Sequence, residues 1–219
     1  MAVIHKNALM VEGKDELRTI PELIEANGIG WVINKQPIVY IQEYDGFSNL
    51  SDPDEITTEL KISGREALGI IFDADDNPSE QWQSIRNSCL QSIPDLPKHI
   101  PEEGLIHTAN LNNGRPIKFG IWMMPDNKMR GMLETFLTTM IPTGKEELWQ
   151  FAQDKTQEAK SKGADFKDTY FDKANIYTWL AWQEEPGRQL HQAIQQQILH
   201  PQHPKAQKFV TWFKTLYGL

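Results

Sequence analysis

Carboxylates stand at the ends of two short apolar runs in the first third of the chain. Glu12 directly follows the run ALMV and precedes Gly13, and the run GIIF is followed by Asp73, Asp75 and Asp76. Carboxylates that lie close together repel one another, and their burial is unfavourable unless something compensates the charge. Two environments compensate it: a bound cation, or a solvated loop whose Asp and Asn residues cap the next helix.

The surrounding residues alternate between strand-like and helix-like patterns. Short apolar runs are typical of buried parallel strands, and apolar residues at helical spacing indicate the helices between them. Pro21 is expected between two helical turns or at the start of a second helix. The alternation predicts an α/β fold with a mostly parallel sheet and an antiparallel edge. The expected strands cover residues 8–12, 37–44, 67–75, 104–110 and 117–125, and the expected helices cover 13–28, 51–62 and 77–93.

The last third of the chain shows helical patterns throughout, with aromatic residues on one helical packing face. We therefore expect two parts: an α/β domain over residues 1–140 and a helical C-terminal extension over residues 141–219 that packs on it.

The carboxyl ends of parallel strands are where ligands collect in open α/β sheets. Asp73 and Asp75 are two residues apart, so on a strand their side chains point the same way. If the first and third strands are neighbours, Glu12 converges with both. Such a set of oxygen donors fits Mg²⁺ or Mn²⁺. The alternative for Glu12 is a pair with Lys14 or a helix cap.

These two motifs resemble the Toprim domain, the metal-dependent fold of topoisomerases, primases and OLD-family nucleases. The Toprim pattern is a Glu, usually followed by Gly, at the end of the first strand and an Asp-x-Asp at the end of the third. Glu12–Gly13 and Asp73–Ala74–Asp75 match it, 61 residues apart. The resemblance covers roughly residues 5–140 and implies a Rossmannoid sheet with flanking helices.

Three further segments are similar to a family of stand-alone Toprim-like proteins: IFDADDNPSEQWQSIRN, FGIWMMPDN and LAWQEEPG. For that family the resemblance implies a fold and no settled activity. In Toprim enzymes the Glu acts as a general acid or base, so the resemblance assigns that role to Glu12. It assigns metal binding to Asp73 and Asp75, with Asp76 as an alternate or outer ligand.

Other residues are weaker candidates for the same site. Glu134 is either an additional metal ligand or an acid favoured by a helix N-terminus. Lys14 could contact a phosphate at the start of a helix or be solvated. Lys173 could reach a phosphate or extend its ammonium group to water from an aromatic helix.

Composition limits the class of protein. The chain has a net charge of −8, so it has no general attraction for nucleic acid and would need metal ions or a local basic strip to bind it. Its single cysteine and its lack of a long apolar run predict a cytoplasmic protein without membrane contact.

The leading hypothesis is a Mg²⁺-dependent nuclease-like enzyme that acts on nucleic acid. The alternatives are a non-catalytic scaffold for a protein partner, or a small-molecule phosphohydrolase or nucleotidyl-transfer enzyme.

Overall fold

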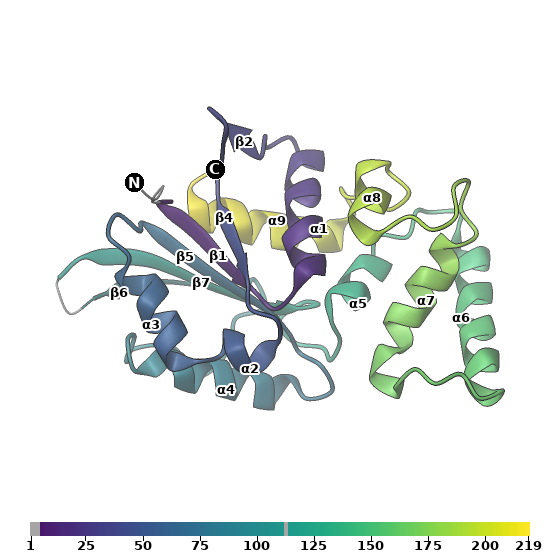
Figure 1. Ribbon diagram of the computed structural model, residues 1–219, viewed down its shortest axis with the longest axis horizontal. Coiled ribbons are helices and arrows are strands. Elements are labelled where there is room, and N and C mark those ends of the chain that lie inside the picture. The colour runs from purple at the N-terminus through teal and green to yellow at the C-terminus, as the bar shows by residue number, and fades with distance from the viewer. Residues whose placement is uncertain (1–4, 112–113) are drawn as a thin grey trace.

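The computed structural model describes residues 5–111 and 114–219 as a five-stranded sheet between two layers of helices, with further helices beyond one end of the sheet (Figure 1). The strand order is β4-β1-β5-β7-β6. All neighbouring strands are parallel except β6 and β7, which pair antiparallel at one edge. The expected α/β fold and its antiparallel edge are confirmed. The strands are β1 (Asn7–Val11), β4 (Tyr40–Glu43), β5 (Ala67–Asp73), β6 (Leu105–Asn110) and β7 (Pro116–Met124).

The central strands are buried on both faces, as continuous apolar runs require. Every residue of β1 is buried, and so are the first six residues of β5. The register places Val11 opposite Ile71 of β5 and opposite Glu43 of β4. The strand expected over 37–44 is shorter in the structure, where β4 begins at Tyr40. Its first residue, Pro37, belongs to a separate two-stranded hairpin of β2 (Val32–Ile33) and β3 (Gln36–Pro37). The connection between the strands expected over 104–110 and 117–125 includes residues 112 and 113, which lie outside the described residues.

Helices cover both faces of the sheet (Figure 1). On one face lie α2 (Phe47–Leu50), α3 (Pro53–Lys61) and α4 (Pro78–Leu90), whose apolar side chains share a core cluster with β5 and β7. On the other lie α1 (Lys14–Ala26) and α9 (Pro204–Tyr217). Helix α1 runs through Pro21 without a break, so Pro21 neither separates two turns nor starts a second helix.

The remaining helices lie beyond the carboxyl ends of the strands (Figure 1). Helices α6 and α7 pack against each other, and α5 lies between them and the sheet. The expected boundary at residue 140 falls in the connection between α5 and α6, and the division into two domains stays a prediction. These elements are α5 (Leu133–Thr138), α6 (Glu146–Ser161), the short 3₁₀ helix η1 (Asp168–Tyr170), α7 (Phe171–Leu180) and α8 (Leu190–Gln195).

A pair of glycines lets α9 approach the middle of the sheet. Gly69 of β5 lies opposite Gly120 of β7. A Cβ atom at Gly69 would lie 2.6 Å from the Tyr217 hydroxyl oxygen, and one at Gly120 would lie 2.6 Å from a methyl carbon of Leu216. The Tyr217 hydroxyl donates a hydrogen bond to the carbonyl oxygen of Ala8 at 2.7 Å. Helix α9 is thereby held on the face opposite α4.

Candidate functional site

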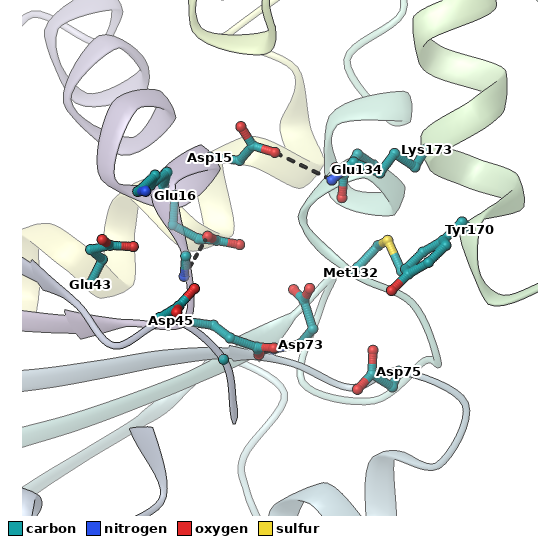
Figure 2. Close-up of a pocket in the computed structure, with 14 residues that line it drawn as sticks. Asp15, Glu16, Glu43, Asp45, Asp73, Asp75, Met132, Glu134, Tyr170 and Lys173 are labelled. Atoms are coloured by element: carbon teal, nitrogen blue, oxygen red, sulfur yellow. Dashed lines mark hydrogen bonds and ion pairs between the residues drawn. The ribbon is translucent and has the colours of Figure 1, made fainter. Parts of the chain in front are cut away.

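A cleft of about 370 Å³ opens at the carboxyl ends of β1 and β5 (Figure 2). It brings together six of the seven residues that the sequence predicts for the site. They come from the ends of two strands, the start of α1, the first turn of α5 and the outer helix α7. The six are Glu12, Lys14, Asp73, Asp75, Glu134 and Lys173.

Glu12 is the first residue after β1, and the parallel register of β1 with β5 brings it to the end of β5. Its Oε2 atom accepts a long hydrogen bond, 3.4 Å, from the backbone N–H of Asp73. Burial raises the pKa of the Glu12 carboxyl, the hydrogen bond from Asp73 lowers it, and the charge of Asp75 raises it again. The net pKa of Glu12 lies above the ordinary value of a glutamate carboxyl.

Asp73 is the last residue of β5, and its carboxylate points into the cleft (Figure 2). Its Oδ1 atom accepts a hydrogen bond from the backbone N–H of Leu133 at 3.0 Å, which ties the end of β5 to the start of α5. Withdrawal from water raises the pKa of Asp73 well above its ordinary value. The carboxylates of Glu16 and Glu12 raise it further. A carboxylate in this environment is stabilised by any cation that enters the cleft.

Asp75 reaches the cleft differently from the way strand alternation predicts. Strand β5 ends at Asp73, and Asp75 has a left-handed backbone with φ of 49°. Its backbone N–H and carbonyl pair with Gly131 at 2.9 and 2.8 Å, and its Oδ2 accepts a hydrogen bond from Gln81 at 2.9 Å. The expected common direction of the two side chains is therefore wrong, because the chain has left the pleat before Asp75. Figure 2 shows the two carboxylates at separate places in the cleft.

Asp76 is the predicted residue that the cleft does not include. It lines a neighbouring cleft of about 400 Å³, whose lining also contains Arg130, Asp168 and Asp172. The two clefts share Asp75, so Asp76 lies next to the site and outside its lining.

Glu134 and Lys173 form an ion pair across the cleft (Figure 2). The Glu134 side chain is 4% exposed, and its Oε1 atom lies 2.7 Å from Nζ of Lys173. The same ammonium group lies 3.3 Å from Oδ2 of Asp15. Partial burial alone would lower the pKa of Lys173, but the hydrogen bond and charge of Glu134, with those of Asp15, raise it overall. Lys14 lines the cleft at the first residue of α1.

Glu16 is a site residue that the sequence analysis missed. It is buried, and its Oε2 atom accepts a hydrogen bond from the backbone N–H of Gly13 at 3.1 Å. Burial raises its pKa to about 7, and the charges of Glu134 and Glu12 add to the rise. An acid in the first turn of a helix ordinarily faces water and stabilises the helix dipole. The signal that could have identified Glu16 is its place one turn after the Glu12–Gly13 motif.

Other missed lining residues include Asp15, Glu43, Asp45 and Tyr170, whose side chain is 44% exposed. The lining therefore holds eight Asp and Glu residues and two Lys residues. Carboxylate oxygens are the donors that Mg²⁺ and Mn²⁺ prefer. Among residues 5–111 and 114–219, no group of three or more His, Cys, Asp or Glu side chains is arranged to hold a metal ion. As they lie, these side chains offer fewer than three protein ligands to any one metal ion.

The comparisons with known proteins show the family. Residues 6–218 match the family described as "Protein of unknown function (DUF3226)", and the chain belongs to that family. No curated protein and no solved structure matches the chain. Within the part of the chain that the structure describes, no helix is long and apolar enough to cross a membrane.

Proposed function

We propose that this DUF3226 protein is a Toprim-like, Mg²⁺-dependent enzyme that cleaves phosphodiester bonds in nucleic acid. The observation that carries the proposal is the meeting of Glu12 and Asp73 at the ends of adjacent parallel strands. Glu12 is followed by Gly13, and Asp73 is followed by a second aspartate, Asp75, that lines the same cleft. The sequence motifs that resemble Toprim domains thus supply residues to one site.

The donor set of the cleft fits a divalent cation. Mg²⁺ in phosphoryl-transfer sites is usually held by one or two carboxylates, by water and by phosphate oxygens of the substrate. A set of fewer than three protein ligands is therefore sufficient for such a site. Asp73 and Asp75 would hold the ion, and the closely packed charges that raise the pKa of Asp73 favour its entry. When bound, the ion would polarise a phosphoryl oxygen and lower the pKa of a coordinated water.

The protein's own groups have separate parts in this proposal. Glu12 would move the proton of the attacking water, because its raised pKa brings it closer to neutral pH than an exposed carboxyl. Lys14 and Lys173 line the cleft and would bind phosphate oxygens of the substrate. Tyr170 offers an exposed ring at the same cleft, on which a base could stack.

A second candidate, hydrolysis of small phosphate esters, is favoured by the charge of the lining. Eight acids and two lysines would repel the successive phosphates of a long polyanion. A cleft of about 370 Å³ is of the size that holds a small ligand. A substrate panel distinguishes the two candidates, since a nuclease cleaves oligonucleotides and a small-ester hydrolase cleaves only mononucleotides and similar esters.

The test compares wild type with Glu12→Gln and Asp73→Asn, with Asp165→Asn as a control at an exposed position. Purified protein is incubated with labelled single-stranded and duplex oligonucleotides, in Mg²⁺ and in EDTA. Mn²⁺ binding is followed by electron paramagnetic resonance. We expect Mg²⁺-dependent cleavage that both site variants lose and the control keeps, and Mn²⁺ binding that Asp73→Asn weakens about tenfold or more, as for loss of a charged ligand. Cleavage that both site variants retain would show that the assignment is wrong.

A further inference from the structure

Part of the negative charge of the cleft is compensated by a lysine from a distant segment of the chain. Among residues 5–111 and 114–219, Lys173 is the one Lys or Arg that forms ion pairs with the carboxylates lining the cleft. It comes from α7, far in the sequence from Glu12 and Asp73. Its ammonium group bridges Glu134 of α5 and Asp15 of α1, at 2.7 and 3.3 Å. The acidic cleft therefore contains a cation of its own.

The two partners of this ion pair differ in their access to water. The Lys173 side chain is 41% exposed, so its ammonium group can be hydrated when it leaves Glu134. The Glu134 side chain is 4% exposed, so its carboxylate cannot be hydrated in the same way. An uncompensated buried charge is strongly unfavourable. A second cation near Glu134 can therefore take the place of Lys173 without leaving this carboxylate uncompensated.

The contact between α5 and α7 does not depend on Lys173 alone. The Thr135 hydroxyl donates a hydrogen bond to Asp172 Oδ2 at 2.7 Å, one residue away on each helix. The helices can thus stay in place while the lysine side chain changes its conformation. Its flexible four-carbon stem allows this movement.

We propose that Lys173 is a built-in counter-cation, which a divalent cation displaces from Glu134 when it enters the cleft. This inference rests on the proposed metal-dependent function and adds to it a competition within the site. Lys173 stabilises the acidic cleft in the absence of metal and weakens metal binding by the same interaction. Once displaced, its ammonium group is free to bind the phosphate of a substrate.

Mn²⁺ binding tests this competition without an assay of activity. Electron paramagnetic resonance titrations compare wild type, Lys173→Met, Lys173→Arg and the control Lys167→Met, which removes an equal charge at an exposed position six residues away. We expect Lys173→Met to bind Mn²⁺ about tenfold more tightly or better, since a hydrogen bond to a charged group changes an equilibrium by that factor. Lys173→Arg and Lys167→Met should remain within about twofold of wild type, because the first keeps the charge and the second lies outside the cleft.

A second measurement uses the wild-type chain, so that it does not depend on the folding of a variant. Amine-reactive labelling followed by mass spectrometry reports how free each lysine is. Mn²⁺ should increase the labelling of Lys173 and leave that of Lys167 unchanged. Equal Mn²⁺ affinity in wild type and Lys173→Met, with unchanged labelling, overturns the counter-cation and leaves the metal site standing. An absence of Mn²⁺ binding in every variant overturns both the inference and the proposed function.

Discussion

The backbone N–H of Asp73 points at the carboxylate of Glu12, with 3.4 Å between the nitrogen and Oε2. The two residues are 61 positions apart, and the parallel pairing of β1 with β5 brings them together. The hydrogen bond holds the Glu12 carboxylate against the backbone of Asp73, whose side chain is the next carboxylate of the cleft. Burial raises the pKa of both carboxyl groups. The charge of Asp75 raises the pKa of Glu12 further, and the charges of Glu16 and Glu12 raise that of Asp73.

Stability should fall as the pH rises, because of Glu16. Its pKa is about 7 in the folded chain and 4.5 in the unfolded reference. Between these values the folded state binds more protons than the unfolded state, so the free energy of unfolding falls with rising pH. The full contribution of Glu16 to stability is present below about pH 4.5, and about 3 kcal/mol of it is lost by pH 8 at 1.36 kcal/mol per pKa unit. Urea unfolding at pH 5 and pH 8 in EDTA measures the loss.

Glu16→Gln should remove the part of that pH dependence that Glu16 contributes, since the amide oxygen can still accept the hydrogen bond from Gly13 and carries no charge. The variant should be more stable than wild type at pH 8 and closer to it at pH 5. Glu103→Gln, at an exposed position, is the control and should follow wild type. Parallel curves for wild type and Glu16→Gln would contradict the prediction.

Asp75 and Asp76 should differ in their effect on metal binding, although they are neighbours in the sequence. Asp75 lines the cleft that contains Asp73, whereas Asp76 lines only the adjoining one. Asp75→Asn should weaken Mn²⁺ binding about tenfold, and Asp76→Asn should change it by no more than about twofold. Spin-resonance titrations of the two variants make a matched pair, since each removes one charge from the same loop. An equal loss in both would place the ion between the two clefts.

A methyl group on either glycine of the sheet centre should destabilise the fold. Gly69→Ala and Gly120→Ala would each place a Cβ atom 2.6 Å from a side-chain atom of α9. Overpacking of this kind costs about 1–3 kcal/mol. Gly30→Ala is the control, because a Cβ atom there meets nothing within 4 Å. Urea unfolding should show the loss for the first two variants and a change within about 0.5 kcal/mol for the third.

Glu59 and Arg65 form a buried ion pair, and their contributions to the free energy of unfolding should be strongly coupled. The two residues are 8% and 4% exposed, and Arg65 also donates hydrogen bonds to the carbonyl oxygens of His5 and Glu59. Arg65→Met should cost about 3–5 kcal/mol, because it leaves the Glu59 carboxylate buried without its cation. Arg65→Met combined with Glu59→Leu should be less destabilised than Arg65→Met alone. A double-mutant cycle from urea unfolding measures the coupling, and additive costs would show that the pair is energetically independent.

Sequence periodicity was sufficient for the architecture. The buried runs before Glu12 and Asp73 are recognisable because a parallel strand is apolar on both faces. Strand β1 ends one residue before Glu12, and β5 ends at Asp73, two residues earlier than the strand expected over 67–75. The antiparallel edge was also predictable from the two adjacent strand patterns. The boundaries of the elements were less predictable. The strand expected over 37–44 contains the last residue of a hairpin strand and a shorter edge strand of the sheet, because turn geometry depends on local backbone angles.

The sequence by itself determined that Glu12 and Asp73 stand at strand ends, since local apolar patterning fixes where a buried strand stops. Only the tertiary structure decided which other groups join them. Asp75 lies at a separate place in the cleft because its backbone pairs with Gly131, and Glu16 faces inward because α1 packs on the sheet. Lys173 reaches Glu134 and Asp15 through the packing of α7 against α5. These contacts join segments as many as 158 residues apart, and no short-range pattern encodes them.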